Sequence, residues 1–240
     1  MSSVKIDPVI PPDSAFPRYR PVADHALLVE LGEAIDPALY ERIWQLDAAL
    51  AAHPIEGVTE TVPAYASLLI DFDPVVTDHQ RIKQAVERLL RESGDKRAAG
   101  TLRDVLVCYE GPFAPDLDAV ASATGLDPEA VIATHLAGSY RVVMYGFVPG
   151  FAYLAGTPEV LRLPRKPTPQ RGIPAGSVLI AGPQCLVTTL TMPTGWWIIG
   201  RSPTAILAED SDQPFLFDVG DSVRFKRINR RDFDIAARRG

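Results

Sequence analysis

From Tyr140 onward, short runs of β-forming residues alternate with turns rich in proline and glycine. The runs are YRVVMYGF, SVLIAG, CLVTTL, WWIIGR, TAILAE and PFLFDVGDSVRFKRI, the last folding around Gly220-Asp221. Closely spaced short strands separated by such turns indicate a barrel or a sandwich. We therefore predict an all-β architecture for this half of the chain, preceded by two short helices that begin near Asp116 and Asp127.

The first hundred residues alternate between strand and helix patterns. Strands are predicted at 26–31, 57–62, 67–72 and 102–109, and helices at 37–52 and from Asp78 to Ser93. The order strand, helix, strand, strand, helix, strand is the split β-α-β pattern of a ferredoxin-like domain. The polar, glycine-bounded segment 94–101 (GDKRAAGT) suggests a border between two units. The predicted fold class is α+β.

Four segments follow from these patterns. They are a Pro-rich disordered leader at 1–18, a ferredoxin-like domain at 19–100, a β-barrel domain at 101–230 and a basic tail at 231–240.

Composition narrows the possible partners and locations. A formal net charge of -6 argues against a nucleic-acid partner, because neutralising phosphates requires a concentrated Lys/Arg surface. The N-terminus has no apolar region typical of a secretory signal, and no apolar run reaches the length of a membrane span. We expect a cytoplasmic protein.

The two cysteines, Cys108 and Cys185, are too isolated for a disulfide framework or a thiolate metal site.

Residues 145–203 carry most of the candidates for chemistry. Arg165, Arg171 and Arg201 are candidates for binding a carboxylate or phosphate, although surface exposure is the commoner fate of a single arginine. The amide of Gln184 is suited to orienting a substrate amide or to capping turn backbone groups. His135, at a predicted helix end, is a candidate general acid/base, or a histidine stabilised by the helix dipole.

The chain lacks the motifs of a self-contained nucleotide or hydrolase site. G-x-x-x-x-G-K-[ST], G-x-G-x-x-G, H-E-x-x-H and G-x-S-x-G are all missing. This pattern favours one member of a multi-protein complex over a complete enzyme. Aromatic residues of the Pro/Gly loops are candidates for contact with a partner or for core burial: Phe151, Tyr153, Trp196 and Trp197.

Several linked motifs occur in the second half of the chain. They are GFVPGFAYLAG at 146–156, Pro164-Arg165, PAGSV at 174–178, IAGPQ at 180–184 and IGRSP at 199–203. The first half adds PAYASLLI at 63–70 and FDP at 72–74. Together these motifs resemble the family of 5-oxoprolinase B subunits, which is also described as allophanate hydrolase subunit 1 and as a sporulation-kinase inhibitor. The similarity covers nearly the whole chain.

The resemblance implies a cyclophilin-like barrel and a role within an ATP-dependent enzyme that opens 5-oxo-L-proline to L-glutamate. The implied partners are the C subunit, also called allophanate hydrolase subunit 2, and the A subunit. The implied ligands are a cyclic amide or carboxylate, and ATP shared with a partner protein; no metal or biotin site is recognised. The implied cleft residues are His135 and Gln184 as catalytic groups, with Phe147, Pro149, Arg165 and Arg201 binding substrate.

The chain departs from the family pattern after Gln184 and at Thr194. These departures predict an altered ligand or lost activity. The alternatives are an inhibitor of a sporulation-type histidine kinase and a carboxyltransferase-like component of urea or allophanate metabolism.

Overall fold

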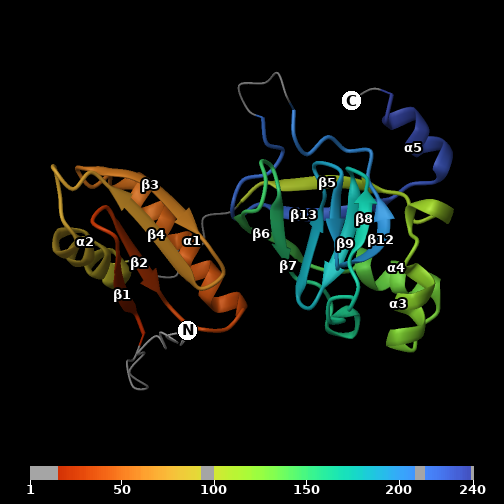
Figure 1. Ribbon diagram of the computed structural model, residues 1–240, viewed down its shortest axis with the longest axis horizontal. Helices are drawn as coiled ribbons and strands as arrows, with labels where there is room; N and C mark the ends of the chain where they lie inside the picture. Colours follow the sequence, from red (N-terminus) through yellow and green to blue (C-terminus); the bar gives the residue numbers. More distant parts are fainter. Residues whose placement is uncertain (1–15, 93–99, 209–213, 239–240) are drawn as a thin grey trace, which may run out of the picture.

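The computed structural model describes residues 16–92, 100–208 and 214–238. The described strands form a four-stranded sheet, a seven-stranded sheet and a two-stranded ribbon. The four-stranded sheet and its helices, residues 18–92, are called the smaller unit here; residues 100–238 are called the barrel unit. Figure 1 shows the two units side by side along the long axis. The expected leader lies almost wholly outside the described residues, as do six residues of the expected border, 94–99.

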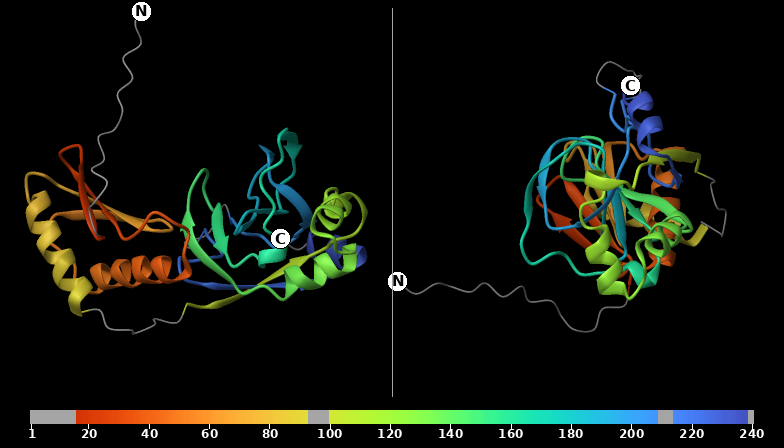
Figure 2. Two further views of the ribbon diagram at one scale, coloured as in Figure 1. Left: turned by 90° about the horizontal axis from the view of Figure 1, so that it is seen from below. Right: turned by 90° about the vertical axis from the view of Figure 1, so that its right-hand side faces the viewer.

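The smaller unit is an antiparallel sheet with two helices on one face (Figure 2). Its strand order is β1-β2-β4-β3. The elements are β1 (Arg18–Val22), β2 (Ala26–Glu30), α1 (Pro37–Ala52), β3 (Val58–Pro63), β4 (Ser67–Phe72) and α2 (His79–Glu92). Alternate residues of β2 and β4, such as Leu27, Leu68 and Ile70, are buried against Leu46 and Val86 of the helices. One apolar sheet face and two apolar helix stripes therefore make this core.

Local signals set the starts of both helices as predicted. The Asp36 carboxylate accepts a hydrogen bond from the Ala38 N–H at 2.7 Å, and Pro37 occupies the first turn, where its missing N–H costs nothing. The Asp78 carboxylate accepts from the Arg81 N–H at 2.9 Å. Each cap satisfies a backbone donor that the helix itself leaves unpaired.

The fourth strand of the smaller sheet was predicted at 102–109, and this is wrong. The strand there, β5 (Leu102–Val107), runs parallel to β13 (Ser222–Arg227) in the seven-stranded sheet. β1, which the sequence analysis did not predict, instead pairs antiparallel with β2 from Arg18 to Val22. The edge beside β2 is thus filled by the chain that precedes it.

The barrel unit is built on the sheet β12-β9-β10-β7-β6-β13-β5. Its strands besides β5 and β13 are β6 (Tyr140–Tyr145), β7 (Ala152–Ala155), β9 (Ser177–Ala181), β10 (Gln184–Val187) and β12 (Trp197–Arg201). The two outer strands meet through reciprocal backbone hydrogen bonds between Cys108 and Arg201, of 2.8 and 2.9 Å. This bridge nearly closes the sheet into a barrel, and closure leaves few unpaired edge groups.

Short helices pack around the barrel (Figure 1). They are η1 (Gly111–Phe113), α3 (Leu117–Thr124), α4 (Pro128–Leu136), η2 (Glu159–Leu161) and α5 (Arg230–Ala236). α5 falls largely within the expected basic tail, and its Phe233 is buried against Phe113 at a ring-centroid distance of 4.3 Å. Within the described part of 204–209, where a strand was predicted, an isolated bridge joins Leu207 to Phe215 instead.

Aromatic side chains of the smaller unit pack on the barrel unit. Tyr65, in the turn between β3 and β4, lies against Val143 and Ala155. Trp44 of α1 stacks with the Arg141 guanidinium at 5.6 Å. These contacts join the smaller unit to β6 and β7.

No helix among the described residues has both the length and the apolar character that crossing a membrane requires.

Candidate functional site

The two faces of strands β9 and β10 belong to different environments. Val178, Ile180 and Cys185 point into the barrel core. Leu179 and Leu186 alternate with them and join a separate apolar cluster on the outer face. Because side chains alternate along a strand, one pair of strands supplies both the barrel interior and the floor of a site outside it.

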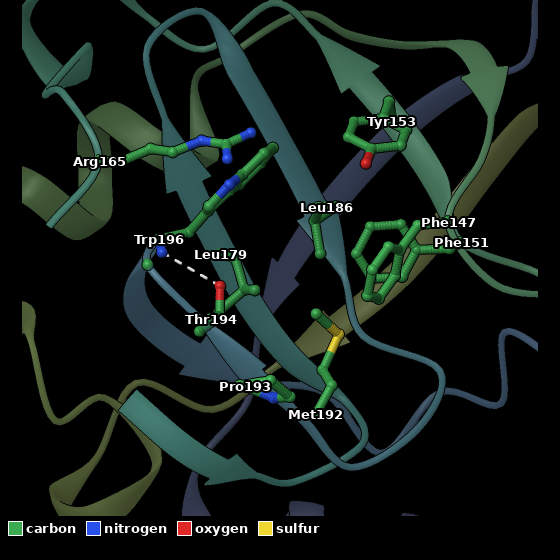
Figure 3. A pocket seen from close by; sticks show the side chains of 11 residues that line it. Phe147, Phe151, Tyr153, Arg165, Leu179, Leu186, Met192, Pro193, Thr194 and Trp196 are labelled. Atoms are coloured by element: carbon green, nitrogen blue, oxygen red, sulfur yellow. Dashed lines mark hydrogen bonds between the residues drawn. The ribbon is translucent and has the colours of Figure 1, made fainter. Parts of the chain in front are cut away.

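A pocket of about 160 Å³ opens on this outer face. Strands β9 and β10 supply its floor, and β7, three loops and β11 (Met192–Thr194) supply its walls. β11 pairs with β8 (Gln170–Ile173) in the two-stranded ribbon. Its lining residues are Phe147, Phe151, Tyr153, Arg165, Leu179, Leu186, Met192, Pro193, Thr194, Gly195 and Trp196. Figure 3 shows Arg165 and Trp196 on one side, with Phe147 and Phe151 facing them from the other. The pocket is mainly apolar with a cation at its edge.

The loop between β6 and β7 is held in a tight turn that presents an aromatic ring. The Val148 N–H donates to the Gly146 carbonyl at 3.0 Å, and the Phe151 N–H donates to the Val148 carbonyl at 3.1 Å. Phe147 has a φ of 76°, a backbone conformation that is unfavourable for a bulky residue, and its side chain is 68% exposed. Such strain at an exposed ring is typical of a ligand-binding position.

Arg165 is positioned by a buried ion pair at the next residue. The Lys166 ammonium lies 2.5 Å from the Asp116 carboxylate, and both side chains are about nine-tenths buried. The same Asp116 oxygen accepts a hydrogen bond from the Ile198 N–H at 2.8 Å. The Lys166 N–H donates to the Gly195 carbonyl at 2.6 Å. These contacts fix the loop so that the Arg165 guanidinium lies 5.6 Å from the centre of the Trp196 ring.

Comparison with known proteins places the chain in a family. Residues 17–217 match the carboxyltransferase domain, subdomain C and D. The chain is 35% identical over 223 residues to the B subunit of 5-oxoprolinase from Bacillus subtilis, covering 88% of this chain and 93% of that protein. It is also 35% identical to the B subunit of 5-oxoprolinase from Escherichia coli O157:H7, covering 85% and 93%. The chain belongs to the family of 5-oxoprolinase B subunits.

Solved structures share the fold of this chain. The chain superimposes on the protein TTHA0988 with a TM-score of 0.74 and 36% identity, covering 86% of this chain and 40% of that one. Urea amidolyase of Kluyveromyces lactis has a TM-score of 0.73 at 20% identity, covering 94% of this chain and 16% of that one, which shows a shared fold. The chain spans well under half of either structure.

The structure separates the six cleft residues predicted for this member of the 5-oxoprolinase B-subunit family. Phe147 and Arg165 line the pocket. The carbonyl of Pro149 accepts a hydrogen bond from Thr189, and neither residue lines the pocket.

Gln184 lies on the outer face at the junction of the two units, beside Tyr65. Arg201 lies away from the pocket, where its Nε donates to the Ala175 carbonyl at 3.3 Å and its guanidinium covers the Phe113 ring.

His135 lies in the barrel core and not in the cleft. Its side chain is fully buried among Tyr109, Tyr140 and Phe225. Its Nδ1 is 2.8 Å from the Tyr109 hydroxyl, and its Nε2 is 3.6 Å from the Cys185 sulfur. Burial lowers the pKa of His135 to about 3, so the imidazole is neutral at physiological pH. His135 does stand in the last turn of α4, and its neutral imidazole lies among core aromatic rings rather than at the pocket.

The buried imidazole predicts a pH-dependent stability. The unfolded chain binds a proton at this histidine below its ordinary pKa of about 6.5, whereas the folded chain resists protonation down to about pH 3. Stability is therefore lost as the pH falls from about 6.5 toward 3, with about 2 kcal/mol lost by pH 5. In urea unfolding at pH 7 and pH 5, His135→Gln should remove this part of the pH dependence, and His53→Gln, at an exposed position, should keep it. An unchanged pH dependence in His135→Gln would contradict the assignment.

Sequence reasoning missed part of the pocket and its support. The sequence analysis did not single out Leu179, Leu186 and Met192, which line the pocket, or Lys166, which supports it. Side chains point to alternate faces along β9 and β10, and this alternation assigns Leu179 and Leu186 to the face opposite the barrel core. No local signal pairs Lys166 with Asp116, because fifty residues separate them. Asp116 does precede a helix as predicted, but its carboxylate makes no cap hydrogen bond.

Proposed function

We propose that this chain is the B subunit of an ATP-dependent 5-oxoprolinase. It acts in the cytoplasm with the A and C subunits in the conversion of 5-oxo-L-proline, ATP and water to L-glutamate. Relatives named as B subunits of 5-oxoprolinase, matched over most of both chains, support the assignment. The observation that carries it is the small apolar pocket with Arg165 at its edge.

The pocket suits a small cyclic acid. Its volume of about 160 Å³ is below the usual range for drug-sized ligands and fits a small metabolite. Aromatic and aliphatic walls from Phe151, Leu186 and Trp196 would cover the methylene groups of a five-membered ring. The guanidinium of Arg165 offers paired donors to the carboxylate. Under this proposal, Arg165 holds the acid and the apolar walls hold the ring.

The pocket does not fit a nucleoside triphosphate by itself. Arg165 is the one cation among the described residues that line it, and the remaining walls are mainly apolar. A triphosphate is normally held by several charged or backbone N–H donors. We therefore assign no phosphoryl-transfer step to this pocket and place ATP at a site shared with, or supplied by, a partner protein.

An enzyme reconstituted from the A and C subunits together with this chain tests the proposal. Arg165→Ala should raise the KM for 5-oxoproline in ATP turnover by roughly tenfold to a hundredfold, the scale of hydrogen bonds to a charged group. Arg165→Lys should recover part of the loss, because the charge remains without the paired donors. Arg88→Ala on α2, an exposed arginine of the smaller unit, is the matched control and should leave KM unchanged.

Two results would overturn the proposal. One is turnover by the A and C subunits that does not change when this chain is omitted. The other is a chain that fails to associate with the C subunit in size-exclusion chromatography yet binds a sporulation-type histidine kinase tightly, which would favour the inhibitor function. Equal KM values for Arg165→Ala and Arg88→Ala would remove Arg165 from the site.

A further inference from the structure

The junction of the two units holds a buried hydroxyl without a regular hydrogen bond. Tyr65 is 9% exposed, and its ring packs on Val143 and Ala155 of the barrel unit. Within the described part of the chain, its hydroxyl oxygen makes no hydrogen bond of regular geometry. Burying a hydroxyl without a partner costs free energy, so such a group calls for a reason.

Gln184 brings this hydroxyl close to the pocket floor. Burial raises the pKa of Tyr65, and the neighbouring Gln184 side chain partly offsets this effect. Gln184 pairs with Ala181 of β9 and Ala155 of β7 on the outer face of the sheet. Leu186, two residues further along the same strand and therefore on the same face, lines the pocket. The polar pair thus lies one step along the strand from the pocket floor.

Tyr153 connects this pair to Arg165. It lines the pocket (Figure 3). It also packs in the cluster that contains Tyr65. Burial raises the pKa of Tyr153, and the Arg165 guanidinium partly offsets this effect, so the phenol lies within electrostatic range of that cation. Tyr153 therefore contacts both the pocket, where Arg165 lies, and the cluster that contains Tyr65.

We propose that Tyr65 is a ligand-binding residue supplied by the smaller unit, which with Gln184 forms a polar subsite for the amide group of a cyclic amide. The hydroxyl and the carboxamide together offer both a donor and an acceptor, which complement a lactam C=O and N–H. Arg165, which lines the pocket, holds the acidic group. This inference rests on the proposed function and makes the smaller unit part of the site.

Calorimetric titration of the complex between this chain and the C subunit tests the inference. The two probes are 5-oxo-L-proline and cyclopentanecarboxylate, which keeps the ring and the acid but has no amide. Tyr65→Phe keeps the packing ring and should weaken 5-oxoproline binding roughly fivefold, the scale of one neutral hydrogen bond. Binding of cyclopentanecarboxylate should not change.

Tyr19→Phe is the matched control, because the Tyr19 hydroxyl is also buried without a regular hydrogen bond but lies on β1, where its ring packs beneath Lys83. It should leave the affinity for both probes unchanged. Thermal unfolding gives a second readout. Since neither hydroxyl has a regular partner in the free protein, both variants should unfold at the wild-type temperature or above it.

The possible outcomes separate the two proposals. If Arg165→Ala weakens binding of both probes and Tyr65→Phe weakens neither, the subsite is overturned and the proposed function stands. If Tyr65→Phe lowers the unfolding temperature and weakens both probes equally, Tyr65 has a structural role only, and the subsite is again overturned. If the wild-type complex binds neither probe, the proposed function fails, and the subsite fails with it.

Discussion

Replacing Asp116 with alanine is expected to destabilise the chain by about 3–5 kcal/mol, the scale for removing one partner of a buried ion pair. The Asp116 carboxylate lies 2.5 Å from the Lys166 ammonium and also accepts from the Ile198 N–H at 2.8 Å. Its removal leaves the buried Ile198 N–H without a partner and the buried Lys166 ammonium without its counter-charge, although the neutral Gln170 side chain still accepts from that ammonium at 2.9 Å. Urea unfolding followed by circular dichroism measures the loss.

Asp118→Ala provides the comparison for this prediction. Asp118 lies in the first turn of the same helix, α3, but its side chain is exposed. Removing it costs only its favourable interaction with the helix dipole, about 0.3–1 kcal/mol. Comparable losses in the two variants would show that the Lys166 pair is not buried as described. A large loss confined to Asp116→Ala would also explain how the pocket loop is held.

Gly156→Ala is expected to cost about 2–5 kcal/mol. Gly156 follows β7 with a φ of 110°, which L side chains rarely adopt, and a Cβ there would lie 2.1 Å from the Ser139 carbonyl oxygen. The backbone conformation alone costs about 1–2 kcal/mol for a residue with a Cβ, and overpacking adds about 1–3 kcal/mol. Because the clash is with backbone, no rotamer change relieves it. The midpoint of urea unfolding at constant m-value measures this effect.

Gly172→Ala separates the two contributions. Gly172 has a φ of 69°, but a Cβ there meets no atom within 4 Å. This variant should therefore lose only the backbone part, about 1–2 kcal/mol. If both variants lose the same free energy, the contact between Gly156 and Ser139 is looser than the structure shows.

The candidate site was only partly predictable from sequence. Phe147 was predicted from the resemblance to the family, and Arg165 both from that resemblance and because a guanidinium in a Pro/Gly-rich loop is suited to binding an anion. His135 stood beside the same loops in sequence, yet the fold places it inside the barrel. Whether a side chain enters the core or the cleft depends on which face of a closed sheet it meets, and no local pattern records that.

The sequence by itself determined the helices whose formation depends on residues close together in the chain. The apolar spacing in 37–52 and the capping residues Asp36 and Asp78 define α1 and the start of α2, because helix geometry and unpaired N–H groups act within a few residues. The α+β class and the β-rich second half follow from the same kind of signal.

Only the tertiary structure decided which distant segments meet. A strand at 102–107 was visible in the sequence, but pairing it with β13 rather than with the smaller sheet joins residues about 120 positions apart. The Lys166–Asp116 pair and the contact between Tyr65 and the barrel unit likewise join residues that are far apart in the sequence. Such contacts form because buried charges need partners and closed sheets leave few free edges, and both conditions depend on the whole fold.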